Sequence, residues 1–341
     1  MDVVIGVDAH KKTHTLVAVN KMGRQLGQKT IATTSTAHGE GVRWARSRFG
    51  TDLVWGVEDC RAYTSRLERD LMAEGLAVVR VPPHLMSRAR ASSRERGKSD
   101  PIDALAVART VLREPNLPIA SHDPVSMELR LLVDRRDDLV GQRTAAINRL
   151  LGRVHHLDPD RRAPTKWSKK ACEEMQAWLA TQDGLIAELA QDEARDILRF
   201  SHDIDRLGQQ IGQRVRTAAA ALLALQGCGE LSAAKIVAEV AGIERFRSEA
   251  AFARYVGLAP TPHSSGETTV RMRPARHGNR QLNMAIHRIA VTQIHHQGPG
   301  HDYFQRRLSE GDDRRRALRS LKRRLVRVVY TRLHADHRGS A

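Results

Sequence analysis

Apolar residues follow two different periods along this chain. In the first 81 residues, short apolar and β-branched runs alternate with polar turns, which is typical of strands. They predict strands over residues 3–8, 13–19, 27–33, 53–57 and 77–81. Helical spacing predicts helices over residues 37–49 and 64–74. The first three strands are close enough in sequence to form an antiparallel meander, so the pattern predicts a mixed α/β sheet.

The stretch Lys98-Ser99-Asp100-Pro101-Ile102-Asp103-Ala104 predicts the start of a further helix. Proline suits the first helical turn, because its missing N–H would find no partner there. Ile102, Leu105 and Ala106 then give one apolar face, which ends near Leu112. With this helix the order of elements is βββαβαβα. That is the order of the ribonuclease H fold, whose inner strands present carboxylates at one edge of a mixed sheet.

Four acids fall at the points where this fold would bring them together. Asp8 and Glu58 each end a predicted strand, and Asp100 and Asp103 lie three residues apart on one face of the predicted helix. By themselves the last two are better explained as a capping box, with Asp100 as N-cap and Asp103 reaching back. Together the four supply oxygen ligands for two Mg²⁺ ions that clamp a phosphoryl group. We therefore predict a catalytic, metal-binding set of Asp8, Glu58, Asp100 and Asp103.

The region from Pro124 to about Ala220 is helical and strongly charged. Its apolar residues recur at heptad-like intervals in two sets, Leu132, Leu139, Ala146, Leu150 and Val154, then Phe200, Ile204, Leu207 and Ile211. This spacing predicts an antiparallel hairpin or an intermolecular coiled coil. A plain helical bundle explains it nearly as well. We interpret the region as an assembly element.

Beyond residue 220, Gly227-Cys228-Gly229 is flanked by apolar helical patterns and followed by Lys235. It resembles a helix-hairpin-helix element, in which a Gly-x-Gly turn brings backbone N–H groups close to a DNA phosphate. A purely structural helical turn is the alternative. The segment from Arg314 to Arg332 predicts a basic amphipathic helix. We interpret it as a nucleic-acid contact rather than the solvated face of a packing helix.

Charge makes a polyanion the expected partner. The chain has 56 Lys and Arg against 39 Asp and Glu, a formal net charge of +17, and only 4% aromatic residues. Nucleic acid fits this balance, and the scarcity of rings argues against binding by base stacking. The residues expected at phosphates are Arg94, Arg96, Lys98, Gly227, Gly229, Lys235, Arg271, Arg273, Arg276 and Arg280.

The three cysteines are far apart, so neither a disulfide framework nor a zinc ribbon is expected. No signal peptide or membrane-spanning apolar run is apparent, which favours a soluble protein in a reducing cytoplasm. We predict four segments. They are an α/β domain over residues 1–120, a helical coiled-coil region over 121–220, a mainly α domain over 221–305 and a basic helical tail over 306–341.

The motif Val7-Asp8-Ala9-His10-Lys11, the strand-ending Glu58 and the stretch 98–104 together resemble the DEDD-type insertion-sequence transposases. The downstream stretch 257–260 (Gly-Leu-Ala-Pro), Ser265-Gly266 and Gly278-Asn279 resemble their C-terminal transposase domain. Ser264 directly precedes Ser265, so either could be the family's serine.

The resemblance implies a site-specific DNA recombinase with a RuvC-like domain, Mg²⁺ or Mn²⁺ at the four acids, and Ser265 as a nucleophile. It also implies a dimer or tetramer, in the bacterial cytoplasm and near the nucleoid. A structured non-coding (bridge) RNA would pair with donor and target DNA. Two alternatives stay open, a junction-resolvase-type nuclease and a non-catalytic nucleic-acid-binding scaffold. An actin-like or sugar-kinase ATPase fits less well, because no Gly-rich phosphate loop follows the first strand.

Overall fold

The computed structural model describes residues 3–58, 61–82, 85–86, 99–114, 117–120, 123–263, 271–273 and 278–340. Within these, the side chains of residues 61–62, 261–263, 271–273 and 340 are not described. The chain forms two compact units. One comprises Met1–His122, Gly242–Tyr255 and Ala259–His277, and the other Asp123–Ala241, Val256–Leu258 and Gly278–Ala341. The predicted division into four segments stays a prediction.

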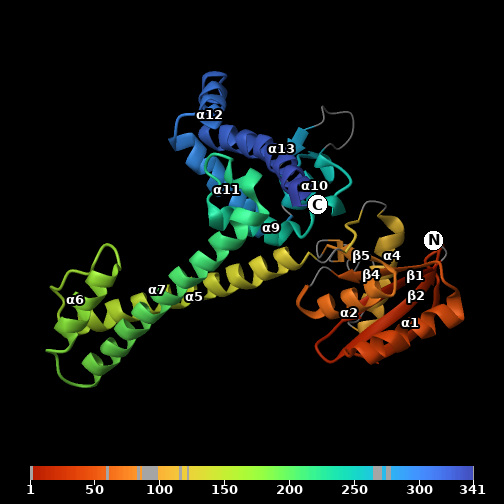
Figure 1. The fold of residues 1–341 in the computed structure, drawn as a ribbon, viewed down its shortest axis with the longest axis horizontal. Coiled ribbons are helices and arrows are strands. Elements are labelled where there is room, and N and C mark those ends of the chain that lie inside the picture. The colour runs from red at the N-terminus through yellow and green to blue at the C-terminus, as the bar shows by residue number, and fades with distance from the viewer. Residues whose placement is uncertain are drawn as a thin grey trace. The chain divides into compact units, whose positions relative to one another are not determined.

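The first unit is built on a five-stranded mixed sheet with strand order β3-β2-β1-β4-β5 (Figure 1). Strand β2 pairs antiparallel with both β1 and β3, whereas β4 pairs parallel with β1 and β5. The elements in chain order are β1 (Val3–Ala9), β2 (Thr13–Asn20), β3 (Gln25–Ala32), α1 (Ser35–Phe49), β4 (Leu53–Glu58), α2 (Arg61–Ala73), β5 (Ala77–Val81) and α4 (Asp100–Arg113). The mixed sheet, the antiparallel meander and the predicted order of elements are confirmed.

The alternation of side chains along β1 separates two hydrophobic cores. Ile5 and Val7 pack in one cluster with residues of α1 and α2, including Val42 and Leu67. Val4 packs in the other cluster with residues of α4. Because successive side chains of a strand point to opposite faces, Gly6 and Asp8 face the same side as Val4, toward α4. The sheet therefore carries α1 and α2 on one face and α4 on the other.

A second, smaller sheet and two short helices complete the first unit. Strand β6 (Thr261–His263) pairs antiparallel with β7 (Arg271–Arg273). They follow a 3₁₀ turn (Ile243–Arg245) and α10 (Glu249–Val256), whose last residue belongs to the second unit. The rings of Phe246 and Tyr255 both lie under the Arg245 guanidinium, 4.5 and 4.6 Å from it. This segment combines short helices with a short two-stranded sheet.

The second unit is all helix, and two long helices dominate it. Its elements are α5 (Pro124–Leu157), α6 (Lys169–Leu179), α7 (Leu185–Ala218), α8 (Ala220–Leu223), α9 (Glu230–Val240), α11 (Arg280–His295), α12 (Pro299–Ser309) and α13 (Arg314–Ser340). Three contacts between α5 and α7 run in opposite chain directions, joining Glu128 to Arg214, Arg143 to Ser201 and Arg149 to Glu193. The two helices are therefore antiparallel, as one of the predicted arrangements required. Assembly through them stays a prediction.

The predicted apolar positions of α5 and α7 form the core between them. Leu139, Ala146, Leu150, Ile197 and Ile204 share one buried cluster. Cys172 and Leu179 of α6, a helix that the pattern did not predict, join the same cluster.

Cys172 and Cys228 are free and buried, and Cys60 lies outside the described residues. Burial raises the pKa of the Cys228 thiol to about 12, which makes it a poor nucleophile. In the part of the chain described, no helix is long and apolar enough to cross a membrane.

Candidate metal and nuclease site

Asp8 and Glu58 lie at the carboxyl ends of two neighbouring parallel strands. Val7 of β1 is paired with Val57 of β4. Extending that register by one residue sets Asp8 beside Glu58, because each strand adds one residue per step. Asp8 is buried, and Glu58 is half-buried and has an interaction of its own. The two strand-end acids therefore share one edge of the sheet, as predicted.

Two glycines let α4 approach this edge of the sheet. Gly6 and Gly56 occupy paired positions two residues before the acids, on the face that α4 covers. A Cβ on Gly6 would lie 2.6 Å from the Ala108 backbone nitrogen, and one on Gly56 would lie 2.6 Å from a Val111 methyl group. Any larger residue would push the helix away. The spacing Gly-x-acid at both strand ends is thus a signal that sequence analysis missed.

Asp100 is the first residue of helix α4 and not its N-cap. Ser99 is the N-cap residue and makes no capping hydrogen bond with its side chain, while Asp100 and Asp103 both stand in the first turn. The backbone N–H groups of Ile102 and Asp103 donate to the Ser99 carbonyl. The interpretation of Asp100 as the N-cap of a capping box is therefore wrong. Asp103 is buried and has a partner of its own, whereas Asp100 is exposed.

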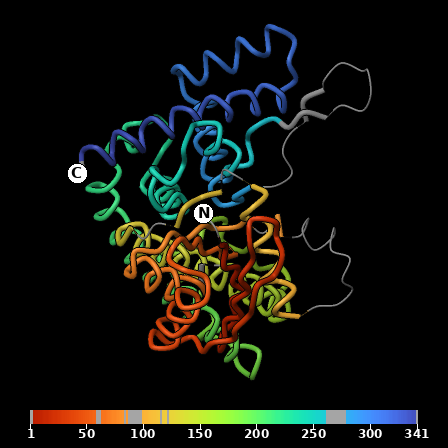
Figure 2. The backbone as a smooth tube through the Cα atoms, turned by 90° about the vertical axis from the view of Figure 1, so that its right-hand side faces the viewer, coloured from red at the N-terminus to blue at the C-terminus, as the bar shows by residue number. Residues whose placement is uncertain are grey.

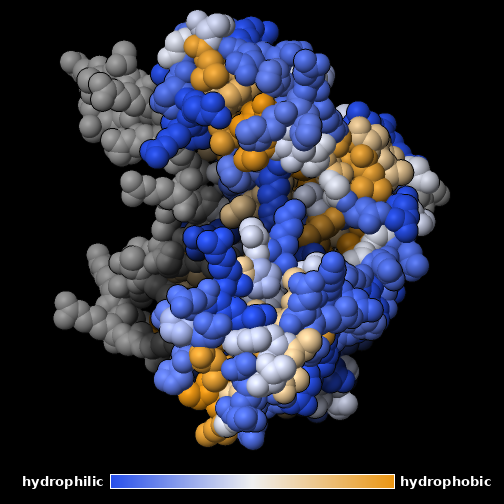
Figure 3. All heavy atoms as spheres, turned by 90° about the vertical axis from the view of Figure 1, so that its left-hand side faces the viewer, coloured by the Kyte–Doolittle hydropathy of each residue, from blue (hydrophilic) through white to orange (hydrophobic). Residues whose placement is uncertain are grey.

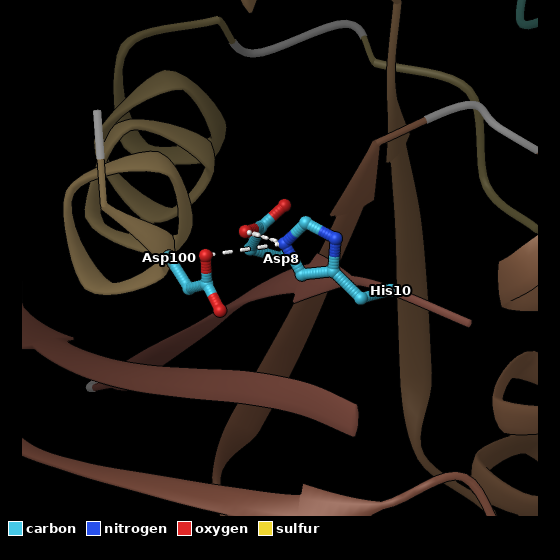
Figure 4. A group of neighbouring side chains, drawn as sticks. All are labelled: Asp8, His10 and Asp100. Carbon is cyan, nitrogen blue, oxygen red and sulfur yellow. Dashed lines mark hydrogen bonds and ion pairs between the residues drawn. The ribbon is translucent and has the colours of Figure 1, made fainter. Parts of the chain in front are cut away.

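His10 joins Asp8 and Asp100 in one cluster (Figure 4). Its Nε2 atom lies 2.9 Å from Oδ2 of Asp8 and 3.3 Å from Oδ1 of Asp100. One ligand atom from each of the three side chains lies within 4.8 Å of the others. Sequence analysis quoted His10 within a motif but gave it no role in the site. Its place could have been predicted from the strand period. Residues 6, 8 and 10 alternate with their neighbours, so His10 would follow Gly6 and Asp8 on the face of β1 that is turned toward α4.

The electrostatics of this cluster show that the predicted acids influence one another. Burial raises the pKa of the Asp8 carboxyl, His10 opposes this rise, and the charges of Asp103 and Asp100 add to it. Asp100 and Asp103 therefore lie close enough to Asp8 to act on its charge. Carboxylates gathered in this way are relieved by a bound cation, which neutralises their charge.

The arrangement fits a divalent ion. Two ligands at about 2.1 Å from an octahedral ion, and at right angles, lie about 3.0 Å from each other. The separations of 2.9 and 3.3 Å between His10 and the two carboxylates are close to this value, and the shorter one is also the length of a hydrogen bond between His10 and Asp8. Oxygen donors suit Mg²⁺ or Mn²⁺, and one imidazole nitrogen is better tolerated by Mn²⁺.

The residues predicted at the Gly-x-Gly turn are ordered by packing within the second unit. Gly227 has φ +83°, and a Cβ there would lie 3.0 Å from Thr292 of α11. Gly229 is the N-cap of α9, with open space around it. Lys235 is buried, and its Nζ donates to Asp137 of α5 at 2.5 Å. A phosphate contact by Lys235 would have to compete with that ion pair.

Most of the other predicted phosphate contacts fall where side chains are not described. Arg280 is exposed at the start of α11, which Asn279 caps by accepting from the Leu282 N–H. Arg271 and Arg273 form β7, but their side chains are not described. Residues outside the described ranges are Arg94, Arg96, Lys98, Ser264, Ser265 and Arg276. Their roles stay predictions.

Comparison with known families matches two parts of the chain. Residues 5–159 match the model of DEDD-type IS110 transposases, and residues 219–305 match the model described as the transposase IS116/IS110/IS902 family. All four predicted acids lie in the first match, and Ser265 lies in the second.

Similar proteins extend over nearly the whole chain. An uncharacterised 44.8 kDa protein of insertion element IS116 from Streptomyces clavuligerus is 25% identical, over 96% of this chain and 94% of that protein. An uncharacterised 42 kDa protein of insertion element IS900 from Mycobacterium paratuberculosis is 24% identical, over 97% and 95%. The transposase for insertion sequence element IS1111A from Coxiella burnetii is 24% identical, over 86% and 78%.

Among solved structures, T. thermophilus RuvC in complex with a Holliday junction substrate is similar to part of the chain. It is 18% identical, with a TM-score of 0.26, over 32% of this chain and 92% of RuvC. This score is too low for the likeness to bear on function.

Proposed function

Since this chain belongs to the IS116/IS110/IS902 family of transposases, enzymes that cleave and rejoin DNA, we propose that it is a metal-dependent recombinase of an insertion sequence. Its RuvC-like sheet domain would carry out the metal-assisted step. The observation that carries this proposal is the meeting of Asp8, His10 and Asp100 within 4.8 Å, on a sheet edge that two glycines open to α4.

We assign the metal to Asp8, Glu58, Asp100 and Asp103, with His10 as a further donor. When bound, the ion would polarise the phosphoryl oxygens and stabilise the leaving oxygen. Asp8 is buried between β1 and α4, so it would hold its ligand atom in a fixed place. Asp100 is exposed in the first turn of α4, so it would face the incoming phosphate. Asp103, one turn further along α4, would offer a further ligand oxygen to the same site.

Strand cleavage and rejoining are assigned to Ser265 as the nucleophile. Its Oγ would attack phosphorus, forming a serine–phosphate bond while the bond to the leaving deoxyribose oxygen breaks and that oxygen takes up a proton. A strand hydroxyl then reverses the step, so no external energy source is needed. Support comes from the second family match, which spans residues 219–305, and from the Ser-Gly motif within it. Ser264 is the competing assignment.

DNA is the expected substrate, and a structured RNA and further copies of the chain are proposed partners. The net charge of +17 supports a polyanion partner. The face drawn in Figure 3 is mostly hydrophilic, with only separate hydrophobic patches. Gly227, Gly229 and Arg280 are proposed as backbone contacts, together with the basic residues whose side chains are not described. Sequence selection by a base-pairing RNA would agree with a protein that has few aromatic residues.

Cleavage by single-acid variants tests the metal-dependent site. Full-length protein is incubated with Mg²⁺ or Mn²⁺, DNA carrying the ends of its own element and RNA transcribed from the element's flanks. Asp8→Asn and Asp103→Asn are expected to lose cleavage while keeping their melting temperature and DNA affinity. Asp160→Asn, an equal charge change at an exposed loop position, should cleave like the wild type. Cleavage that persists in EDTA, or in Asp8→Asn, would refute the proposed function.

A further inference from the structure

Helix α13 carries a row of arginines that face solvent. Arg315, Arg319, Arg323 and Arg327 are all exposed and recur at every fourth residue. The helix is one continuous rod from Arg314 to Ser340 (Figure 2). At 1.5 Å per residue, the row is about 18 Å long. It lies beyond residue 305, where the second family match ends. We call these four residues the arginine row.

The arginine row lies opposite the packing face of α13. The buried side chains recur at the same interval, at Ala317, Leu321, Leu325, Val329 and Leu333. The first four of them are each two residues from a member of the row, which is about 200° around the helix. They pack in the second unit, where α13 contacts α8, α11 and α12. The helix is therefore held by its apolar face, and the row is exposed on the opposite side.

Several cations of α13 have partners within the protein, and Arg327 of the row also has an interaction there. Arg316 pairs with Asp312 at 2.9 Å, Lys322 donates to Asn283 at 2.7 Å, and the Arg324 guanidinium lies 4.5 Å from the centre of the Tyr303 ring. Two members of the row lie near an acid, Asp313, whose pKa is lowered first by backbone hydrogen bonds and then by the charges of Arg319 and Arg315.

Repulsion among the charges of the arginine row lowers the stability of α13 when no ligand is bound. Residues 314–335 contain nine Lys and Arg and no Asp or Glu. Like charges four residues apart on a helix destabilise it by about 0.2–0.5 kcal/mol for each pair. A polyanion bound along the row would remove this repulsion. Without such a ligand, the repulsion would only lower the stability of the helix.

We propose that the arginine row binds the phosphate backbone of duplex DNA. Guanidinium groups bind phosphate oxygens in a bidentate manner, and a row of regularly spaced guanidinium groups suits a regular backbone. Single strands are usually held by stacking on aromatic rings. Tyr330, three residues after the last arginine of the row, is half-buried, and its ring centroid lies 4.6 Å from that of His334. The choice of DNA rests on the proposed function, because the family acts on DNA.

Salt-dependent binding by a triple variant tests this proposal. Arg315, Arg319 and Arg323 are changed to Gln in the full chain, and Arg327 is kept because it has a further interaction within the protein. The matched control changes Arg195, Arg199 and Arg206 to Gln. These arginines are also exposed, but each is paired with an aspartate three residues earlier on α7. Both variants lose the same charge, so a difference between them reports on position.

Affinity for a 30-base-pair duplex is measured by fluorescence anisotropy between about 50 and 300 mM salt, with melting temperature as a check on folding. Each phosphate contact contributes about 0.9 to the slope of log affinity against log salt. The row variant should lower that slope by about 3 and weaken binding at least tenfold at moderate salt. The control should change the slope by less than 1.

Three results would overturn the proposal. They are a wild-type slope in the row variant, an equal loss in the control, and a loss confined to duplex RNA of the same length. The third result would assign the row to RNA phosphates instead. All four acids remain in the row variant, so its outcome is separate from that of Asp8→Asn, which tests the metal-dependent site.

Discussion

Gly6 of β1 packs directly against Ala108 of α4. A Cβ at Gly6 would lie 2.6 Å from the Ala108 backbone nitrogen and 2.8 Å from its Cβ, and would also meet the Ala104 carbonyl. Real Cβ atoms do not come this close to backbone. The absence of a side chain at Gly6 therefore sets the distance between sheet and helix, and with it the position of Asp100 and Asp103 above Asp8.

Gly6→Ala should cost stability and activity together. Overpacking against backbone costs about 1–3 kcal/mol and shifts the helix, because neither neighbour can rotate away. Chemical denaturation should show a lower free energy of unfolding, and cleavage should fall more than stability alone explains. Gly141→Ala on α5 is the control, since a Cβ there meets nothing within 4 Å. It should stabilise the helix by up to about 1 kcal/mol. If Gly6→Ala is as stable as the wild type, the close approach has no structural role.

His10→Ala should change which ion the site prefers. An imidazole donor adds more to the affinity for Mn²⁺ than for Mg²⁺, so its loss should lower the affinity for Mn²⁺ by about tenfold and for Mg²⁺ by less. Electron paramagnetic resonance of Mn²⁺, with Mg²⁺ as competitor and no DNA, measures both affinities. His202→Ala, at an exposed histidine of α7, should leave them unchanged. An unchanged Mn²⁺ affinity in His10→Ala would show that the imidazole is not a ligand. Loss of Mn²⁺ binding in Asp8→Asn would still support the carboxylates.

Stability should fall as the pH drops from about 6.5 to 4, because of His14. Burial, followed by the charges of His38 and His10, lowers the pKa of His14 to about 4 from an ordinary value of 6.5. His14 is buried on β2, and its ring stacks on that of His38 with centroids 5.3 Å apart. The unfolded chain therefore binds a proton first as pH falls, and folding loses about 3 kcal/mol over this range.

The pH effect is checked by chemical denaturation between pH 4 and 8. His14→Leu should flatten the decline between pH 6.5 and 4, because it removes the group that must take up a proton. His202→Leu should leave the decline unchanged, since His202 is exposed. A decline of the same size in His14→Leu would mean that other groups cause it.

Ser265→Ala should abolish recombination together with any protein–DNA adduct that survives denaturation. The reason is that a covalent serine–phosphate bond is the only link in the proposed reaction between cleavage and rejoining. Gel electrophoresis in denaturant measures the adduct, and Ser264→Ala is the matched control. A dead Ser264→Ala with an active Ser265→Ala would reverse the assignment of the two serines. Full activity in both variants would favour a nuclease that uses only the acids and water.

The local elements of this protein follow from its sequence. Short apolar runs separated by polar turns are enough to predict β1, β2 and β4, and helical spacing of apolar residues is enough to predict α5, α7 and α13. Both depend on residues that are near one another along the chain. The strand ends at Asp8 and Glu58 could be predicted for the same reason, and so could their meeting at one sheet edge, because parallel strands end together. The pattern missed α6 and α12, which are each only 11 residues long.

Only the tertiary structure decided how the site is completed. The proximity of His10 to Asp100 depends on how closely α4 can pack on the sheet, and this was set by the contacts that Gly6 and Gly56 permit. The N-cap of α4 fell on Ser99 rather than Asp100, since the helix starts where packing and backbone bonds allow. Lys235 was buried beside Asp137 by the packing of α9 on α5. Each of these depends on residues distant in sequence, whose contacts no local pattern records.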